Sequence, residues 1–112
     1  MNSLIVIPAL NEESSIKNVI DTLHNDGFHN VLVVNDCSTD NTSKIVLENN
    51  AQLMNLPLRL GAWGATQTGI RYALKNGFDY VITMDADGQH LSQGTRSLIQ
   101  KIKQSKSNVV IG

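Results

Sequence analysis

Short continuous apolar runs alternate along the chain with longer segments whose apolar residues recur every three or four positions. The runs predict buried β-strands, because a strand that is covered on both faces needs no alternation with polar residues. Five such strands are expected, at Leu4–Ile7, Val31–Val34, Ala51–Leu56, Tyr80–Met84 and Val109–Ile111.

The segments between these runs carry signals for the start and end of helices. Asn11 precedes two glutamates and is a good N-cap, whereas Gly27 and Gly77 are suited to helix ends. A face of small side chains in the third segment favours close packing. The expected helices run from an Asn11 cap to Gly27, from a Ser38 or Thr39 cap past Leu47, from Gly64 to Gly77, and from Ser92 through Ile102.

Strands that alternate with helices predict an α/β fold. We expect an open, mostly parallel sheet with helices on both faces, a Rossmann-like arrangement in which residues 1–112 form a single domain. The chain stops directly after its last predicted strand, so it is expected to be truncated before a further half.

Composition excludes several classes of function. The formal net charge is −1 and aromatic residues make up 4% of the chain, so no basic or stacking surface for nucleic acid is indicated. Cys37 is the one cysteine, which excludes an internal disulfide and favours the cytoplasm. No apolar stretch is long enough for a signal peptide or a spanning helix.

Polar clusters follow three of the predicted strands. Ligands of open parallel sheets bind beyond the carboxyl ends of the strands. If the sheet order brings these strands together, all three clusters line one crevice. The clusters are Pro8–Glu12, Asn35–Asp40 and Asp85–His90.

Asp85 and Asp87 are one residue apart, so they point the same way on an extended segment. Two like charges this close favour a cation beside them, and oxygen ligands favour Mg²⁺ or Mn²⁺ together with a phosphate-bearing ligand. The alternative is that both residues form a polar turn and cap the next helix. The apolar strand before them and Gly88-Gln89 after them favour the metal.

Asp36 has two interpretations of similar weight. Its carboxylate could accept from the N–H groups of a nucleobase, or it could belong to a turn that caps a helix. Gly61–Gly64 is only a weak match to a phosphate loop. Arg59 could meet phosphate, although a solvated arginine is the commoner outcome, and His90 is a further candidate ligand.

Four blocks of the sequence together resemble family 2 glycosyltransferases of the GT-A fold, in that family's order. The group they are most similar to comprises the polyprenyl-phosphate sugar transferases, such as dolichyl-phosphate-mannose synthases. The blocks are VIPALNEE, VVNDCSTDNT, GAWGATQTGIRYAL and TMDADGQH.

The resemblance implies transfer of a sugar, with inversion, from a nucleoside-diphosphate donor held through a divalent cation. It also implies a polyprenyl-phosphate or glycan acceptor. Residues that match its nucleotide-binding positions are Pro8, Leu10, Glu12, Val34, Asp36, Asp85 and Ala86. Those that match its metal positions are Asp85, Asp87 and Gln89.

Three residues depart from the pattern of this family. Leu10 stands where the family usually has tyrosine, and Asn35 and Cys37 stand where it usually has aspartate and glycine. The lost glycine is expected either to strain the turn after the second strand or to alter its path. The family's catalytic base is expected beyond Gly112, and no residue of this chain is assigned that role.

Two other functions remain open from the sequence. One is a non-catalytic nucleotide- or metal-binding module, and the other is a sugar nucleotidyltransferase, which the acidic first loop disfavours. The run Val109–Ile111 would also leave a strand edge that favours a symmetric homodimer, the alternative being a monomer with a frayed tail.

Overall fold

The computed structural model of the chain describes residues 2–86 and 100–101. Two predicted features lie mostly or wholly outside them: the helix after Ser92 and the strand at Val109–Ile111. The described elements alternate as expected. They are β1 (Ser3–Ala9), α1 (Ile16–Asn25), β2 (Val31–Asn35), α2 (Thr42–Glu48), β3 (Gln52–Asn55), α3 (Gly61–Lys75), β4 (Tyr80–Thr83) and β5 (Gln100–Lys101).

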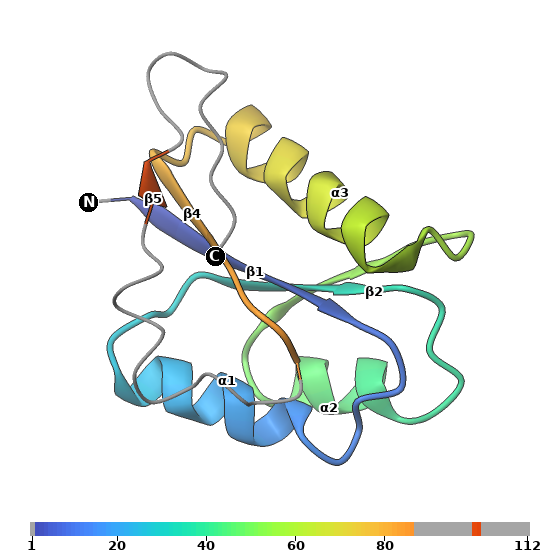
Figure 1. Cartoon of the computed structure of the whole chain (residues 1–112). Coiled ribbons are helices and arrows are strands. Elements are labelled where there is room, and N and C mark those ends of the chain that lie inside the picture. The colour runs from blue at the N-terminus through green and yellow to red at the C-terminus, as the bar shows by residue number, and fades with distance from the viewer. Residues whose placement is uncertain (1, 87–99, 102–112) are drawn as a thin grey trace.

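The strands form one sheet in the order β3-β2-β1-β4-β5. β1 pairs in parallel with both β2 and β4, and β2 pairs in parallel with β3. The predicted open, mostly parallel sheet is therefore confirmed. Because β1 lies between β2 and β4, the loops that follow these three strands emerge at one edge of the sheet (Figure 1).

One predicted helix is wrong at the two of its residues that the structure describes. The helix expected from Ser92 through Ile102 would include Gln100–Lys101, but these two residues form β5 and pair antiparallel with β4. The open edge of β4 offers their backbone groups hydrogen-bond partners, and this tertiary pairing overrides a helical period that rested on three apolar positions.

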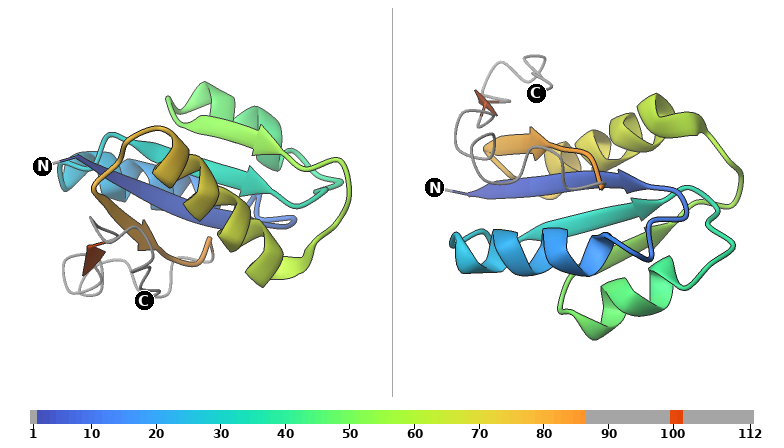
Figure 2. Two further views of the ribbon diagram at one scale, coloured as in Figure 1. Left: turned by 90° about the horizontal axis from the view of Figure 1, so that it is seen from above. Right: turned by 60° about the horizontal axis from the view of Figure 1, so that its bottom comes forward.

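Helices cover both faces of the sheet, as Figures 1 and 2 show, with α1 and α2 on one side and α3 on the other. Alternate residues of each strand enter the two cores. On β1, Ile5 and Ile7 pack with α1, whereas Leu4 and Val6 pack with α3, and all four are at most 1% exposed. This double burial is the physical reason that the strands are continuously apolar.

Helix α3 approaches the sheet closely at Gly69. A Cβ atom built there would lie 2.3 Å from Cγ1 of Val6. Glycine thus allows the backbone of α3 to rest on the side chains of β1. In residues 2–86, no helix is long and apolar enough to cross a membrane.

Candidate functional site

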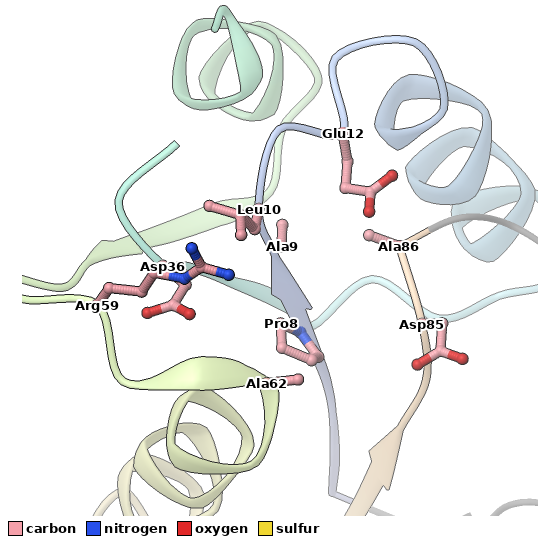
Figure 3. A pocket seen from close by; sticks show the side chains of 9 residues that line it. All are labelled: Pro8, Ala9, Leu10, Glu12, Asp36, Arg59, Ala62, Asp85 and Ala86. Carbon is pink, nitrogen blue, oxygen red and sulfur yellow. The ribbon is translucent and has the colours of Figure 1, made fainter. Parts of the chain in front are cut away.

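An open pocket of about 380 Å³ lies at the carboxyl ends of β1, β2 and β4. The strand ends are aligned there: Ala9 is paired with Asn35, and the amide of Asp36 donates to the carbonyl of Ala9 at 2.9 Å. Each of the three predicted polar clusters has described residues at this edge, and in the third cluster these are Asp85 and Ala86. The residues that line the pocket are Pro8, Ala9, Leu10, Glu12, Asp36, Arg59, Ala62, Asp85 and Ala86 (Figure 3).

One end of the pocket is acidic. The Asp85 side chain is exposed, directly after β4, and Glu12 comes from the loop after β1 (Figure 3). Ser15 joins these two segments, because its hydroxyl donates to the carbonyl of Ala86 at 2.7 Å and lies 3.2 Å from Oε1 of Glu12. The start of α1 therefore fixes the backbone that carries Asp85.

The opposite end contains Asp36, which is 3% exposed. Its two carboxylate oxygens accept hydrogen bonds from the backbone amides of Leu60 and Gly61, at 2.7 and 2.9 Å. These amides belong to the start of α3, which has unpaired N–H groups that attract a negative charge. Asp36 thus caps a helix, as one of its two predicted interpretations required, but the helix is α3 rather than the next one along the chain.

Arg59 is the residue that sequence reasoning undervalued. It precedes the two amides that Asp36 holds, and its exposed side chain lines the pocket. Within residues 2–86 it forms no ion pair. Its position in the sequence, between Pro57 and Gly61 at the entry to a helix, could have indicated a place near the ligand edge of the sheet. Only the hydrogen bonds from Leu60 and Gly61 to Asp36 show that this entry lies at the pocket.

The loops after β1 and β2 are joined by hydrogen bonds between side chains and backbone, a contact that we call the loop seam. The amide of Asn11 donates to the hydroxyl of Ser38 at 2.9 Å, and the side-chain carbonyl of Asn11 accepts from the amide of Thr39 at 2.7 Å. The amides of Glu12 and Glu13 donate to Thr42 and Asp40 at 2.9 and 3.1 Å.

The seam overturns two predicted helix caps. Asn11 has a φ of 54° and lies outside α1, whose N-cap is Ser15. Ser38 and Thr39 likewise precede the N-cap of α2, which is Asn41. These polar side chains form hydrogen bonds with backbone amides of the neighbouring loop instead of capping their own helices. Sequence spacing cannot reveal a partner so distant along the chain.

Hydrogen bonds from the loop seam and the start of α2 lower the pKa of the Asp40 side chain. Its slight burial raises the pKa, but hydrogen bonds from the hydroxyl and amide of Thr42 and from the amide of Glu13 outweigh this effect. The pKa of Asp40 is therefore lower than its ordinary value of 3.8.

Cys37 has a φ of 67°, in the left-handed region that favours glycine. The strain predicted for this turn is thus present in the backbone. The thiol donates to the carbonyl of Leu56 at 3.4 Å, so the side chain has a weak polar contact in return.

The predicted nucleotide positions are brought together with one exception. Six of the seven line the pocket, whereas Val34 is fully buried in the core beneath α3. Asp87, Gln89 and His90 lie outside the described residues. Among residues 2–86, no group of three acidic, histidine or cysteine side chains could hold a metal ion, so Asp85 would need ligands from elsewhere.

The family model for glycosyl transferase family 2 matches residues 4–112, and the chain belongs to this family. The resemblance found in the four sequence blocks is therefore confirmed.

Named relatives agree with this assignment. UDP-N-acetylglucosamine–dolichyl-phosphate N-acetylglucosaminyltransferase of Methanococcus voltae is 37% identical over 125 residues, which cover 96% of this chain and 50% of the relative. Undecaprenyl-phosphate mannosyltransferase of Micrococcus luteus is 29% identical over 118 residues, which cover 100% of this chain and 48% of the relative. The chain spans about half the length of these curated relatives.

Solved structures place the fold in the same class. Glucosyl-3-phosphoglycerate synthase of Mycobacterium tuberculosis, crystallised with Mn²⁺ and UDP-glucose, superposes with a TM-score of 0.62 and 29% identity. The match covers 77% of this chain and 33% of that protein.

Proposed function

We propose that this chain is the donor-binding part of a nucleotide-sugar transferase. The observation that supports it most strongly is the meeting of three strand-end clusters at one pocket, in a chain of glycosyl transferase family 2. Names of relatives and titles of structural neighbours include UDP-N-acetylglucosamine and UDP-glucose, so UDP is the first nucleotide to test.

In the proposed complex, the nucleoside diphosphate lies across the pocket. Its ribose hydroxyls have two acceptors within reach of the acidic end, Glu12 and Asp85. Asp85, Asp87 and Gln89 would hold a divalent cation, Mg²⁺ or Mn²⁺. When bound, the cation supplies Lewis-acid stabilisation of the departing diphosphate. An exposed carboxylate at the pocket fits this use, because hard cations take oxygen ligands and keep positions for phosphate.

In the reaction, the bond between the anomeric carbon and the donor phosphate breaks as an acceptor oxygen bonds to that carbon. The relatives' names include dolichyl phosphate and undecaprenyl phosphate, which supports a polyprenyl phosphate as acceptor. We assign no catalytic base among the described residues. Inversion, and the symmetric homodimer expected from the strand edge at Val109–Ile111, stay predictions.

The proposal is tested by titrating UDP into the chain with Mn²⁺, with Mg²⁺ and with EDTA. Divalent metal should tighten binding, because the acidic end and a diphosphate repel each other without it. Asp85→Asn and Asp87→Asn should each remove most of this gain, about tenfold in affinity. Asp79→Asn, an exposed aspartate that does not line the pocket, is the matched control.

Equal affinity with and without metal, in the wild type and in both variants, would contradict a metal-bound donor. If UDP does not bind under any condition, the donor assignment itself fails for this nucleotide, and the titration is repeated with GDP. Failure of both nucleotides would overturn the proposal.

A further inference from the structure

Large apolar side chains are exposed mainly on α3 and the loop that leads into it. In the described part of the chain, four of the five exposed large apolar side chains belong to residues 58–74, and the fifth is Leu47 of α2. The four expose between 41% and 69% of their surface, so the core does not account for them. They are Leu58, Leu60, Trp63 and Leu74.

The exposed residues of α3 share one side of the helix, because they recur every three or four positions. They include Trp63, Gln67, Arg71, Leu74 and Lys75. Leu60 extends this side, since a Cβ atom built on Gly64, in the first turn of α3, would lie 2.7 Å from the Cβ atom of Leu60. The opposite side of α3 packs on β1, β2 and β4, and none of the described elements covers the outer side (Figures 1 and 2). A continuous group of exposed apolar side chains of this kind marks an interaction surface.

The charged residues of the same segment are all positive. Residues 49–78 contain three basic residues and no acidic one, whereas residues 12–48 contain seven acidic and two basic residues. The net charge of −1 therefore conceals an uneven distribution between the two sides of the sheet. Arg71 and Lys75 are exposed, and neither forms an ion pair with another described residue. The outer side of α3 thus attracts anions.

Exposed tryptophan and leucine beside free basic side chains suit the boundary of a lipid bilayer with anionic headgroups. The apolar side chains enter the region between headgroups and acyl chains, while arginine and lysine extend to the phosphates. A nucleic acid is a poorer match, because leucine side chains would face its charged backbone. A second copy of the chain would have to bring its acidic α1 and α2 side to this surface, which leaves the leucines without apolar partners.

We propose that the outer side of α3 and its entry form a contact surface for an anionic lipid bilayer, which we call the α3 surface. Its residues are Leu58, Leu60, Trp63, Arg71, Leu74 and Lys75. None of them lines the pocket, so the inference goes beyond the proposed function and does not depend on it. Ala62 lines the pocket and Trp63 follows it, so the α3 surface adjoins the pocket at the start of the helix.

Trp63 provides a direct test, because it is the only tryptophan of the sequence and its fluorescence reports on this surface alone. The full chain is titrated with vesicles of phosphatidylcholine and with vesicles of phosphatidylcholine mixed with phosphatidylglycerol. With the mixed vesicles, the emission should move to shorter wavelength, and brominated acyl chains should quench it. Binding to phosphatidylcholine alone should be weaker by about tenfold or more, and added NaCl should release the chain from mixed vesicles.

Substitutions on the two sides of the sheet show whether α3 is responsible. Arg71→Gln and Lys75→Gln should each weaken binding to mixed vesicles by about fivefold, and Leu74→Ser should do the same by loss of apolar contact. The matched controls are Lys44→Gln and Leu47→Ser, an exposed lysine and leucine of α2, which should sediment with vesicles like the wild type. Melting temperatures check that each variant is folded.

Several results would overturn the α3 surface. These are an unchanged Trp63 emission with mixed vesicles, equal binding to both kinds of vesicle, or equal losses in the α2 controls. A shift of the emission with protein concentration, without lipid, would show that a second copy occupies the surface instead. UDP affinity of the α3 variants should match that of the wild type, since their residues do not line the pocket. Failure of bilayer binding is therefore distinguished from failure of donor binding.

Discussion

At the scale of single residues, the turn after β2 contains a conflict between side chain and backbone. Cys37 adopts a φ of 67°, which costs an ordinary residue about 1 kcal/mol or more. In return, its thiol makes one weak contact to Leu56. The turn lies between Asp36 and the loop seam, so its path is fixed by bonds on both sides, and the residue bears the strain.

Cys37→Gly should therefore stabilise the protein, by about 0.5 to 1 kcal/mol in the free energy of unfolding. Relief of the left-handed strain exceeds the extra entropy that glycine gives the unfolded chain. Urea denaturation measures the difference. Cys37→Ala is the control, because it removes the thiol but keeps the Cβ atom that causes the strain. A less stable glycine variant would show that the thiol contact outweighs the strain.

The lowered pKa of Asp40 predicts a dependence of stability on acid. A carboxyl with a lower pKa in the folded state stabilises the fold above its unfolded pKa, and this contribution disappears as the pH falls through the folded value. The loss should thus begin below about pH 3.8, the ordinary value.

Asp40→Asn should remove this part of the acid sensitivity. Urea midpoints measured from pH 7 to pH 2.5 should fall less steeply below pH 4 in the variant than in the wild type, although the variant is less stable at pH 7. Asp26→Asn, at an exposed aspartate outside the loop seam, should keep the wild-type slope. Parallel curves for wild type and Asp40→Asn would exclude the effect.

Residue roles were harder to predict than residue positions. Most of the proposed nucleotide positions do line the pocket, because motif order and strand ends determine them. The partners of Asn11 and Asp36 lie 27 to 28 and 24 to 25 residues away, respectively. No local pattern identifies such a partner, and for the same reason Arg59 could not be distinguished from a solvated arginine.

At the scale of elements, strands were predicted more closely than helices. Each of the four parallel strands contains most of its predicted run. Burial leaves an unbroken apolar signal in β1, β2 and β4, whereas β3 is partly exposed. The starts of two helices differ from their predicted positions. Helix α1 begins at Ile16, later than an Asn11 cap implies, and α3 begins at Gly61, earlier than the predicted Gly64. In both cases the residues at the helix entry form hydrogen bonds with other loops. The β5 pairing was missed, as its partner is the edge of a distant strand.

The face of small side chains on α3 is predicted to contribute to the stability of the protein. Gly69→Ala should lower the free energy of unfolding by about 1 to 2 kcal/mol, because the new methyl group would lie 2.3 Å from Val6, and overpacking exceeds the gain in helix propensity. Thermal or urea denaturation measures the change. Gln67→Ala, at an exposed position of the same helix, should not destabilise.

A compensating variant checks the cause of this loss. Val6→Ala removes the methyl group in contact, so Gly69→Ala should cost little when added to Val6→Ala. If Gly69→Ala is as stable as the wild type, α3 does not depend on its close approach to β1.

At the scale of the whole molecule, the sheet order and the pocket have one cause. A central β1 that pairs with β2 and β4 places the three loops after these strands together, and double burial makes each strand continuously apolar. The fold class could therefore be predicted from the apolar runs, and the location of the pocket from the polar clusters at the ends of those runs. Which side chains would face a ligand depends on bonds between loops, which the pattern does not contain.

The loop seam also determines where the chain can change in length. Surface loops usually accept inserted residues or a grafted peptide, because few contacts depend on their path. Here the connections at Asn11–Glu13 and Ser38–Asp40 hold each other through their backbone amides, so an insertion in either one would disrupt both and displace a wall of the pocket. The turns at Gly27 and Gly77 connect the opposite ends of the strands. A tag, a label or a fused domain placed at these turns would leave the ligand edge of the sheet intact.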